Sequence, residues 1–152
     1  MNLFLVQHGE AKSKEEDPER PLTDRGKEEV KKVASFLAQV GLKVNQIRHS
    51  GKKRAEETAH ILSDQILPTS GVMAIQGLAP NDNVTSVAEV LQLESKPVML
   101  VGHLPFMSRL ASLLLAGDEE KSVVRFRMGG CICLKRENGD WSLQWAVTPE
   151  LL

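Results

Sequence analysis

Short apolar runs alternate with amphipathic segments along the chain up to Gly117. The apolar runs predict buried strands, and the segments between them repeat apolar residues with helical spacing, which predicts one buried face for each helix. The expected strands are Leu3–Gln7, Asn45–His49, Val72–Ile75 and Val98–Val101. Four helices are expected. The first begins after Thr23, the second ends at Ile66, the third covers Val84–Leu91, and the fourth runs from Pro105 to Gly117. Strands that alternate with helices are typical of a parallel sheet.

The last thirty residues have a different pattern. Apolar residues and arginines alternate over 124–128, which predicts a half-exposed strand. The apolar segments Cys131–Glu137 and Asp140–Val147 flank Asn138-Gly139, a strong signal for a β-hairpin. The sequence therefore predicts an α/β fold with three layers, α/β/α, in which a mostly parallel sheet carries antiparallel edge strands.

Composition narrows the class of protein. A chain of 152 residues is expected to form one domain, spanning residues 1–152. Its formal net charge of −1 gives no reason to expect nucleic acid or a membrane surface as a partner. Leu3–Val6 is too short for the core of a signal peptide, so we expect a cytoplasmic protein. The two cysteines, Cys131 and Cys133, offer too few ligands for a metal site and are expected to be packing residues.

Candidate chemistry is found where two of the expected strands end. His8-Gly9 follows the first strand, and Gly102-His103 follows the fourth. The carboxyl ends of parallel strands share one edge of the sheet, where α/β proteins bind ligands. Arg54 lies at the start of a helix that follows another strand. Two histidines and an arginine at one edge are suited to binding an anion, above all a phosphoryl group.

Four segments, in this order, resemble the histidine phosphatase superfamily, and in particular its branch of SixA-type phosphohistidine phosphatases. They are Gln7-His8-Gly9, Glu19-Arg20-Pro21-Leu22-Thr23, Arg54-Ala55-Glu56-Glu57-Thr58 and Gly102-His103-Leu104-Pro105. The resemblance extends from Leu3 to about Pro149 and implies a phosphoglycerate mutase-like fold. The one departure is Gln7, because the family signature reads Arg-His-Gly.

The resemblance implies a role for each matched residue. His8 would be the nucleophile that forms a phosphohistidine intermediate, with its other ring nitrogen bonded to a backbone carbonyl. His103 would donate to the phosphoryl oxygens, and the guanidinium of Arg54 would bind two of them. Gln7 would bind phosphate without a charge, and loss of a charged donor typically costs about 2.7–4 kcal/mol of transition-state stabilisation. Arg20, which matches an arginine of SixA-like chains, could replace that charge.

The general acid is less well defined in the sequence. Asp82, in the loop after the third strand, is one candidate, and the alternative is that it caps the next helix. A weak acid suits a phosphoramidate, whose P–N bond is labile. We therefore expect a phosphatase that needs neither metal nor cofactor, acts on protein phosphohistidine and has reduced activity because of Gln7. Its expected partner is a signalling or phosphotransfer protein. The alternatives are a phosphomonoesterase for a small metabolite and a non-catalytic module that binds phosphate or a phosphoprotein.

Overall fold

The computed structural model describes every residue from Met1 to Leu152. Six strands form one sheet in the order β3-β2-β4-β1-β5-β6. They are β1 (Asn2–Gln7), β2 (Gln46–His49), β3 (Val72–Ala74), β4 (Val98–Gly102), β5 (Cys131–Glu137) and β6 (Asp140–Val147). The first four strands are parallel to one another, whereas β5 pairs antiparallel with β1 and β6 pairs antiparallel with β5. The predicted fold class is confirmed.

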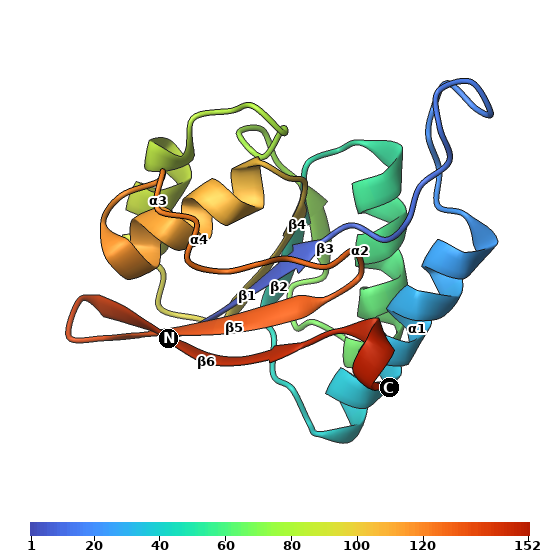
Figure 1. Ribbon diagram of the computed structural model, residues 1–152. Helices are drawn as coiled ribbons and strands as arrows, with labels where there is room; N and C mark the ends of the chain where they lie inside the picture. Colours follow the sequence, from blue (N-terminus) through green and yellow to red (C-terminus); the bar gives the residue numbers. More distant parts are fainter.

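Helices cover both faces of this sheet (Figure 1). One face carries α1 (Asp24–Gln39) and α2 (Lys53–Ile66), and the other carries α3 (Val84–Leu93) and α4 (Phe106–Ala116). A 3-10 turn, η1 (Pro149–Leu151), ends the chain's regular structure. No helix combines the length and the apolar character that crossing a membrane would require.

The central strand β1 is buried on both sides. Phe4 and Val6 belong to the core beneath α1 and α2, while Leu3 and Leu5 belong to the core beneath α3 and α4. A strand with two buried faces needs an uninterrupted apolar run, which explains the sequence Leu3-Phe4-Leu5-Val6. Burial on both faces fixes the position of the residue that follows the strand, His8.

The element ends follow the predicted signals closely. The Thr23 side chain accepts a hydrogen bond from the Gly26 N–H at the start of α1, and Gly117 ends α4 with a left-handed conformation. Asn138 and Gly139 both have positive φ, as a tight hairpin between β5 and β6 requires. Both cysteines are buried in β5 and carry free thiols, as expected for packing residues.

One predicted element is wrong. Residues 124–128 form no strand, and their burial alternates only in part: Phe126 is buried between two exposed arginines, but Met128 is 43% exposed. The backbone makes a single bridge, from Met128 to Gln7, and β5 takes the place beside β1. An alternating pattern indicates which side chains are buried, but a strand also needs a free neighbouring edge for its backbone.

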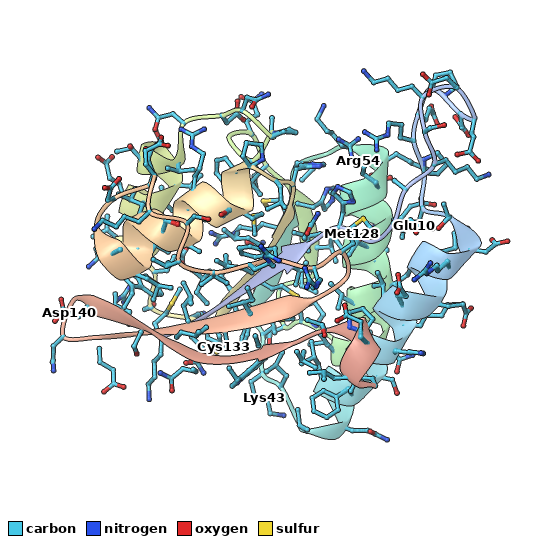
Figure 2. All side chains as sticks on the ribbon, viewed as in Figure 1. Glu10, Lys43, Arg54, Met128, Cys133 and Asp140 are labelled. Atoms are coloured by element: carbon cyan, nitrogen blue, oxygen red, sulfur yellow. The ribbon has the colours of Figure 1, made fainter.

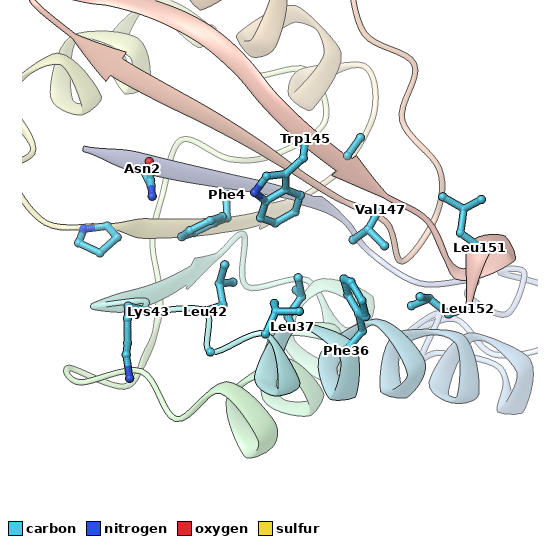
Figure 3. Close-up of a pocket in the computed structure, with 14 residues that line it drawn as sticks. Asn2, Phe4, Phe36, Leu37, Leu42, Lys43, Trp145, Val147, Leu151 and Leu152 are labelled. Atoms are coloured by element: carbon cyan, nitrogen blue, oxygen red, sulfur yellow. The ribbon is translucent and has the colours of Figure 1, made fainter.

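An apolar groove of about 880 Å³ lies between α1 and the edge strand β6 (Figure 3). Phe4, Leu37, Trp145 and Val147 line it, and the rings of Phe4 and Trp145 lie 6.0 Å apart. None of its lining residues belongs to the strand ends that carry His8 and His103. This groove is therefore separate from the candidate site.

The side chain of Thr58, buried within α2, ties the end of β1 to that helix. Its hydroxyl accepts a hydrogen bond of 3.0 Å from the Gly9 N–H and donates one of 2.7 Å to the Arg54 carbonyl. The backbone beside His8 is thereby fixed relative to the first turn of α2, which carries Arg54.

A second contact from the same helix holds the loop before α1. The Glu57 carboxylate accepts a hydrogen bond of 2.7 Å from the Leu22 N–H. Leu22 follows Arg20 and Pro21, so α2 also limits where Arg20 can lie. One helical turn thus positions two segments, the end of β1 and the loop before α1, relative to Arg54.

Replacing Thr58 by valine should destabilise the protein. The isosteric change keeps the volume but leaves the buried Gly9 N–H without an acceptor, at a cost of about 1–3 kcal/mol in the free energy of unfolding. Urea denaturation of T58V and wild type measures this difference. The matched control is T85V, at an exposed position in the first turn of α3. Equal stability of the two variants would contradict a structural role for the Thr58 hydroxyl.

Candidate active site

His8 occupies the first position after β1, and its backbone N–H donates to the Gly102 carbonyl at the end of β4. Its Nδ1–H donates a hydrogen bond of 2.7 Å to the Gly9 carbonyl, since a carbonyl can only accept. Nε2 therefore carries the lone pair. Burial, followed by the positive charges of Arg54 and Arg20, lowers the pKa of His8 to about 4. The imidazole is neutral at pH 7, as a nucleophile requires.

The glycine after His8 is explained by packing. A Cβ on Gly9 would lie 2.8 Å from the Val30 side chain, closer than packed atoms can approach. Helix α1 therefore packs directly against the backbone beside His8. The glycine permits this close approach and keeps the turn narrow.

His103 lies beside His8, although 95 residues separate them in the sequence. Their ring centroids are 5.0 Å apart, with an angle of 53° between the planes. Burial, together with the nearby charges of His8, Arg54, Lys52 and Arg20, lowers the pKa of His103 to about 3. Two neutral imidazoles therefore face one space at the carboxyl edge of the sheet.

Ser50 is a site residue that the sequence analysis missed. Its Oγ lies 2.6 Å from His103 Nε2, and the Lys52 N–H donates to the same oxygen over 3.3 Å. With Lys52 as donor, the hydroxyl hydrogen of Ser50 is free to bond to His103. The sequence did contain a signal for Ser50. It directly follows β2, so it lies at the same edge of the sheet as the ends of the other parallel strands.

Arg54, in the first turn of α2, supplies positive charge to this space. Its Nε is buried and has no hydrogen-bond partner. Burial, and then the charge of Arg20, lowers the pKa of its guanidinium. Two arginines that disfavour each other's charge are stabilised when an anion lies between them.

The loop before α1 brings Arg20 to the same place. Arg20 and Arg54 both line a cavity of about 550 Å³. Arg20 has a φ of 51° and its Nε donates to the Lys12 carbonyl over 3.0 Å, so the loop itself orients the side chain. Its charge contributes, after burial, to the lowered pKa of both histidines.

Gln7 stands where the family signature has arginine, and its side chain is 9% exposed. Its Oε1 is buried without a partner, as are Arg54 Nε and His103 Nδ1. These are the only such side-chain atoms in the protein, and all three belong to this site. Buried polar atoms nearly always have partners, so this cluster is typical of a site built for a ligand. Figure 2 shows Arg54 and Glu10 near the end of β1, far from Asp140 at the hairpin.

Asp82 is placed beside the arginines but does not cap α3. Asn83 makes that cap by accepting from the Thr85 N–H, whereas Asp82 Oδ2 accepts a hydrogen bond of 2.9 Å from the Ala79 N–H. The expectation that Asp82 caps the helix is wrong, since the residue one position later has the geometry for it. Asp82 lines the cavity that contains Arg20 and Arg54. Its role as an acid remains a prediction.

Comparison with known proteins agrees with this geometry. Residues 3–73 match the family model of the histidine phosphatase superfamily, branch 1. An uncharacterized protein of Picosynechococcus sp. is 35% identical over 125 residues, which cover 78% of this chain and 75% of that protein. The phosphohistidine phosphatase SixA of Escherichia coli is 25% identical over 98% of this chain and 94% of its own length.

A solved structure extends the likeness to three dimensions. The protein histidine phosphatase SixA, in complex with tungstate, superposes with a TM-score of 0.88 at 25% identity, covering 99% of both chains. The sheet order, the paired histidines and the sequence matches lead to one assignment. The chain belongs to the histidine phosphatase superfamily.

Proposed function

We propose that this protein removes phosphoryl groups from protein phosphohistidine, with His8 as the nucleophile. One observation carries the proposal: His8 is neutral, its Nδ1–H is held by the Gly9 carbonyl, and its ring, with Nε2 free, lies beside the ring of His103 and within reach of the Arg54 charge. The site has the parts that phosphoryl transfer needs, namely an oriented nucleophile and donors for the phosphoryl oxygens.

The reaction proceeds in two displacements. Nε2 of His8 attacks phosphorus, the P–N bond to the substrate imidazole breaks, and that imidazole takes up a proton from Asp82 or water. Water then attacks the phosphorus on His8 and gives a proton back to Asp82 or to solvent. The new P–N bond breaks, and inorganic phosphate leaves with His8 neutral again. Arg54, Arg20, Gln7 and His103 stabilise the phosphoryl oxygens in both steps. Only groups of the protein and water take part.

A phosphohistidine is the substrate that this site favours among phosphorylated compounds. Its imidazole leaves readily once protonated, so it places a small demand on the general acid. Asp82 Oδ2 already accepts a hydrogen bond from the Ala79 N–H, so one oxygen of this carboxyl group is engaged within the protein. The two SixA proteins to which the chain is similar are named as phosphohistidine or protein histidine phosphatases. A signalling or phosphotransfer protein that carries phosphohistidine is the partner that we propose.

Gln7 favours one further candidate, a module that binds phosphoryl groups without turnover. An uncharged amide stabilises a developing phosphoryl charge less than arginine does. Arg20 argues for catalysis, because it supplies a second guanidinium to the cavity of Arg54. Turnover of a phosphohistidine substrate distinguishes the phosphatase from the binding module.

The covalent step predicts a phosphoenzyme on His8. Mixing the protein with a ³²P-labelled phosphohistidine protein and quenching within milliseconds should trap a label that is stable in base and lost in acid. H8A should form no such species, and chelating agents should not reduce its yield in wild type. A label that survives acid, or one that H8A still acquires, would rule out the mechanism.

The lowered pKa of His8 predicts an unusual pH response. The imidazole should remain neutral, with its proton on Nδ1, from pH 7 down to about pH 4, instead of titrating near 6.5. Because protonation occurs in the unfolded chain first, the stability that buried neutral histidines contribute is present above pH 6.5 and declines toward pH 4. ¹⁵N NMR of the ring nitrogens measures the titration, with the exposed His60 as an internal comparison. Titration of His8 near pH 6.5 would contradict the structure.

Positions 20 and 7, which hold Arg20 and Gln7, predict opposite effects of substitution on catalytic efficiency. R20A should lower kcat/KM by roughly 10²–10³-fold, because it removes the charge that replaces the missing arginine at position 7. Q7R should gain less than about tenfold, since a third guanidinium beside Arg20 and Arg54 is destabilised by like charge. Steady-state rates with a phosphohistidine protein measure both effects. R25A, an exposed arginine at the start of α1, is the control.

The reverse result would be equally informative. A large gain in Q7R with no loss in R20A would show that Arg20 does not contact the phosphoryl group. Absence of turnover in wild type and Q7R, with phosphate binding retained, would establish the binding module instead.

A further inference from the structure

Two surfaces flank the phosphoryl site, and they differ in chemistry. One is the basic cavity lined by Arg20 and Arg54, which are joined there by Lys14, Lys52 and Lys53. The only carboxylates on its wall are Glu19 and Asp82. The whole chain has a net charge of −1, so this local excess of cations is not a consequence of composition.

The lysines of this basic cavity have few partners within the protein. Lys14 and Lys52 form no ion pair, and Lys53 forms only a 4.0 Å contact with Glu56 one helical turn away. All three are exposed. Neither charge balance nor packing within the fold explains their presence, whereas an acidic partner would.

A second surface beside the site is a groove of about 390 Å³ that begins at Leu104, the residue after His103. Its apolar lining residues are Leu104, Val123, Val124 and Phe126, and its polar ones are Ser108, Ser122 and Arg125. Leu104 is 41% exposed and Val123 47% exposed. Met128, 43% exposed, lies beside the site as well, because its backbone bridges to Gln7. Exposed apolar side chains that gather around a site indicate an interaction surface.

The segment that carries most of this groove is held against the site by its backbone. It belongs to no helix or strand, yet the Gly129 N–H donates to the carbonyls of Gln7 (2.9 Å) and His8 (3.3 Å). The Val123 N–H donates to the Ser112 hydroxyl over 3.4 Å. The groove is therefore fixed relative to the two histidines by hydrogen bonds at both of its ends.

We propose that the two surfaces together dock the substrate protein. The docked partner presents a phosphohistidine with acidic side chains on one side, facing the basic cavity, and an apolar side chain on the other, facing the Leu104–Val123 groove. The cavity and the groove share no lining residue, so a ligand that contacts both extends across the site. A small phosphorylated metabolite would need neither. This inference rests on the proposed phosphatase activity and adds how the substrate is selected.

Synthetic peptides test the proposal. Two probes carry a central phosphohistidine with three glutamates on one side and two leucines on the other, in the two possible orders. A third has serine at every flanking position, and free phosphohistidine is the fourth substrate. We expect one acidic–apolar probe to exceed the serine peptide in kcat/KM by about tenfold, with the advantage shrinking as salt rises. Equal kcat/KM for all three peptides would overturn the proposal.

Variants on each surface test whether the preference for the flanked peptide depends on the basic cavity and on the Leu104–Val123 groove. The double variant K14S/K53S should lower kcat/KM for the preferred probe by about 3–10-fold, the range for two exposed ion pairs, and V123S by a few-fold. Neither should change the rate with free phosphohistidine. The controls are K31S/K32S on α1, where Lys31 pairs with Glu28 as Lys53 does with Glu56, and V90S, 53% exposed on α3.

Each outcome has one meaning. Losses confined to the flanked peptide and to the site-side variants support docking. Equal losses with free phosphohistidine, or equal losses in the control variants, overturn docking and leave the phosphatase intact. Absence of turnover with every substrate overturns the proposed function, and the docking proposal with it.

Discussion

The candidate site depends on the first turns of α2, which hold two distant segments by hydrogen bonds and carry Arg54 as well. The buried Thr58 hydroxyl holds Gly9, the Glu57 carboxylate holds Leu22, and Arg54 projects its own guanidinium toward the histidines. The first two of these are ordinary hydrogen bonds. Together they set the distances among His8 after β1, Arg20 on the loop before α1 and Arg54 on the helix. The arrangement of the candidate site is therefore a property of how α2 packs against the end of β1 and the loop before α1.

Burial and charge have different effects within this arrangement. The histidines are neutral because they are buried among positive charges, so the fixed positive charge of the site comes from arginines. Arg54 occupies the position that the family motif gives it, and Arg20 reaches the site through a strained loop with positive φ. Exchange of arginine for glutamine at position 7 alters one donor of this group. The strand that carries it is buried on both faces and is held by its apolar residues, which the exchange does not touch.

Sequence alone predicted what local patterns encode. Helical and strand periodicity gave the parallel core, Thr23 and Gly117 marked helix ends, and Asn138-Gly139 located the hairpin. Apart from the cap of α3, which Asn83 makes in place of Asp82, the missed features depend on residues far apart in sequence. Ser50 meets His103 across 53 positions and Gly9 meets Thr58 across 49, and no periodicity reports such contacts. Residues 124–128 alternate like a strand, but whether a strand forms depends on which segment takes the place beside β1.

The two buried cysteines on β5 make the central sheet accessible to measurement. Cys131 and Cys133 pair with Val6 and Phe4 of β1, the strand that ends at His8. Burial raises the pKa of both thiols, that of Cys133 to about 11, so neither reacts with thiol reagents while the sheet is closed. Exposure of either thiol requires β5 to separate from its surroundings. The rate of thiol labelling thus measures how often the strand pair that precedes His8 opens.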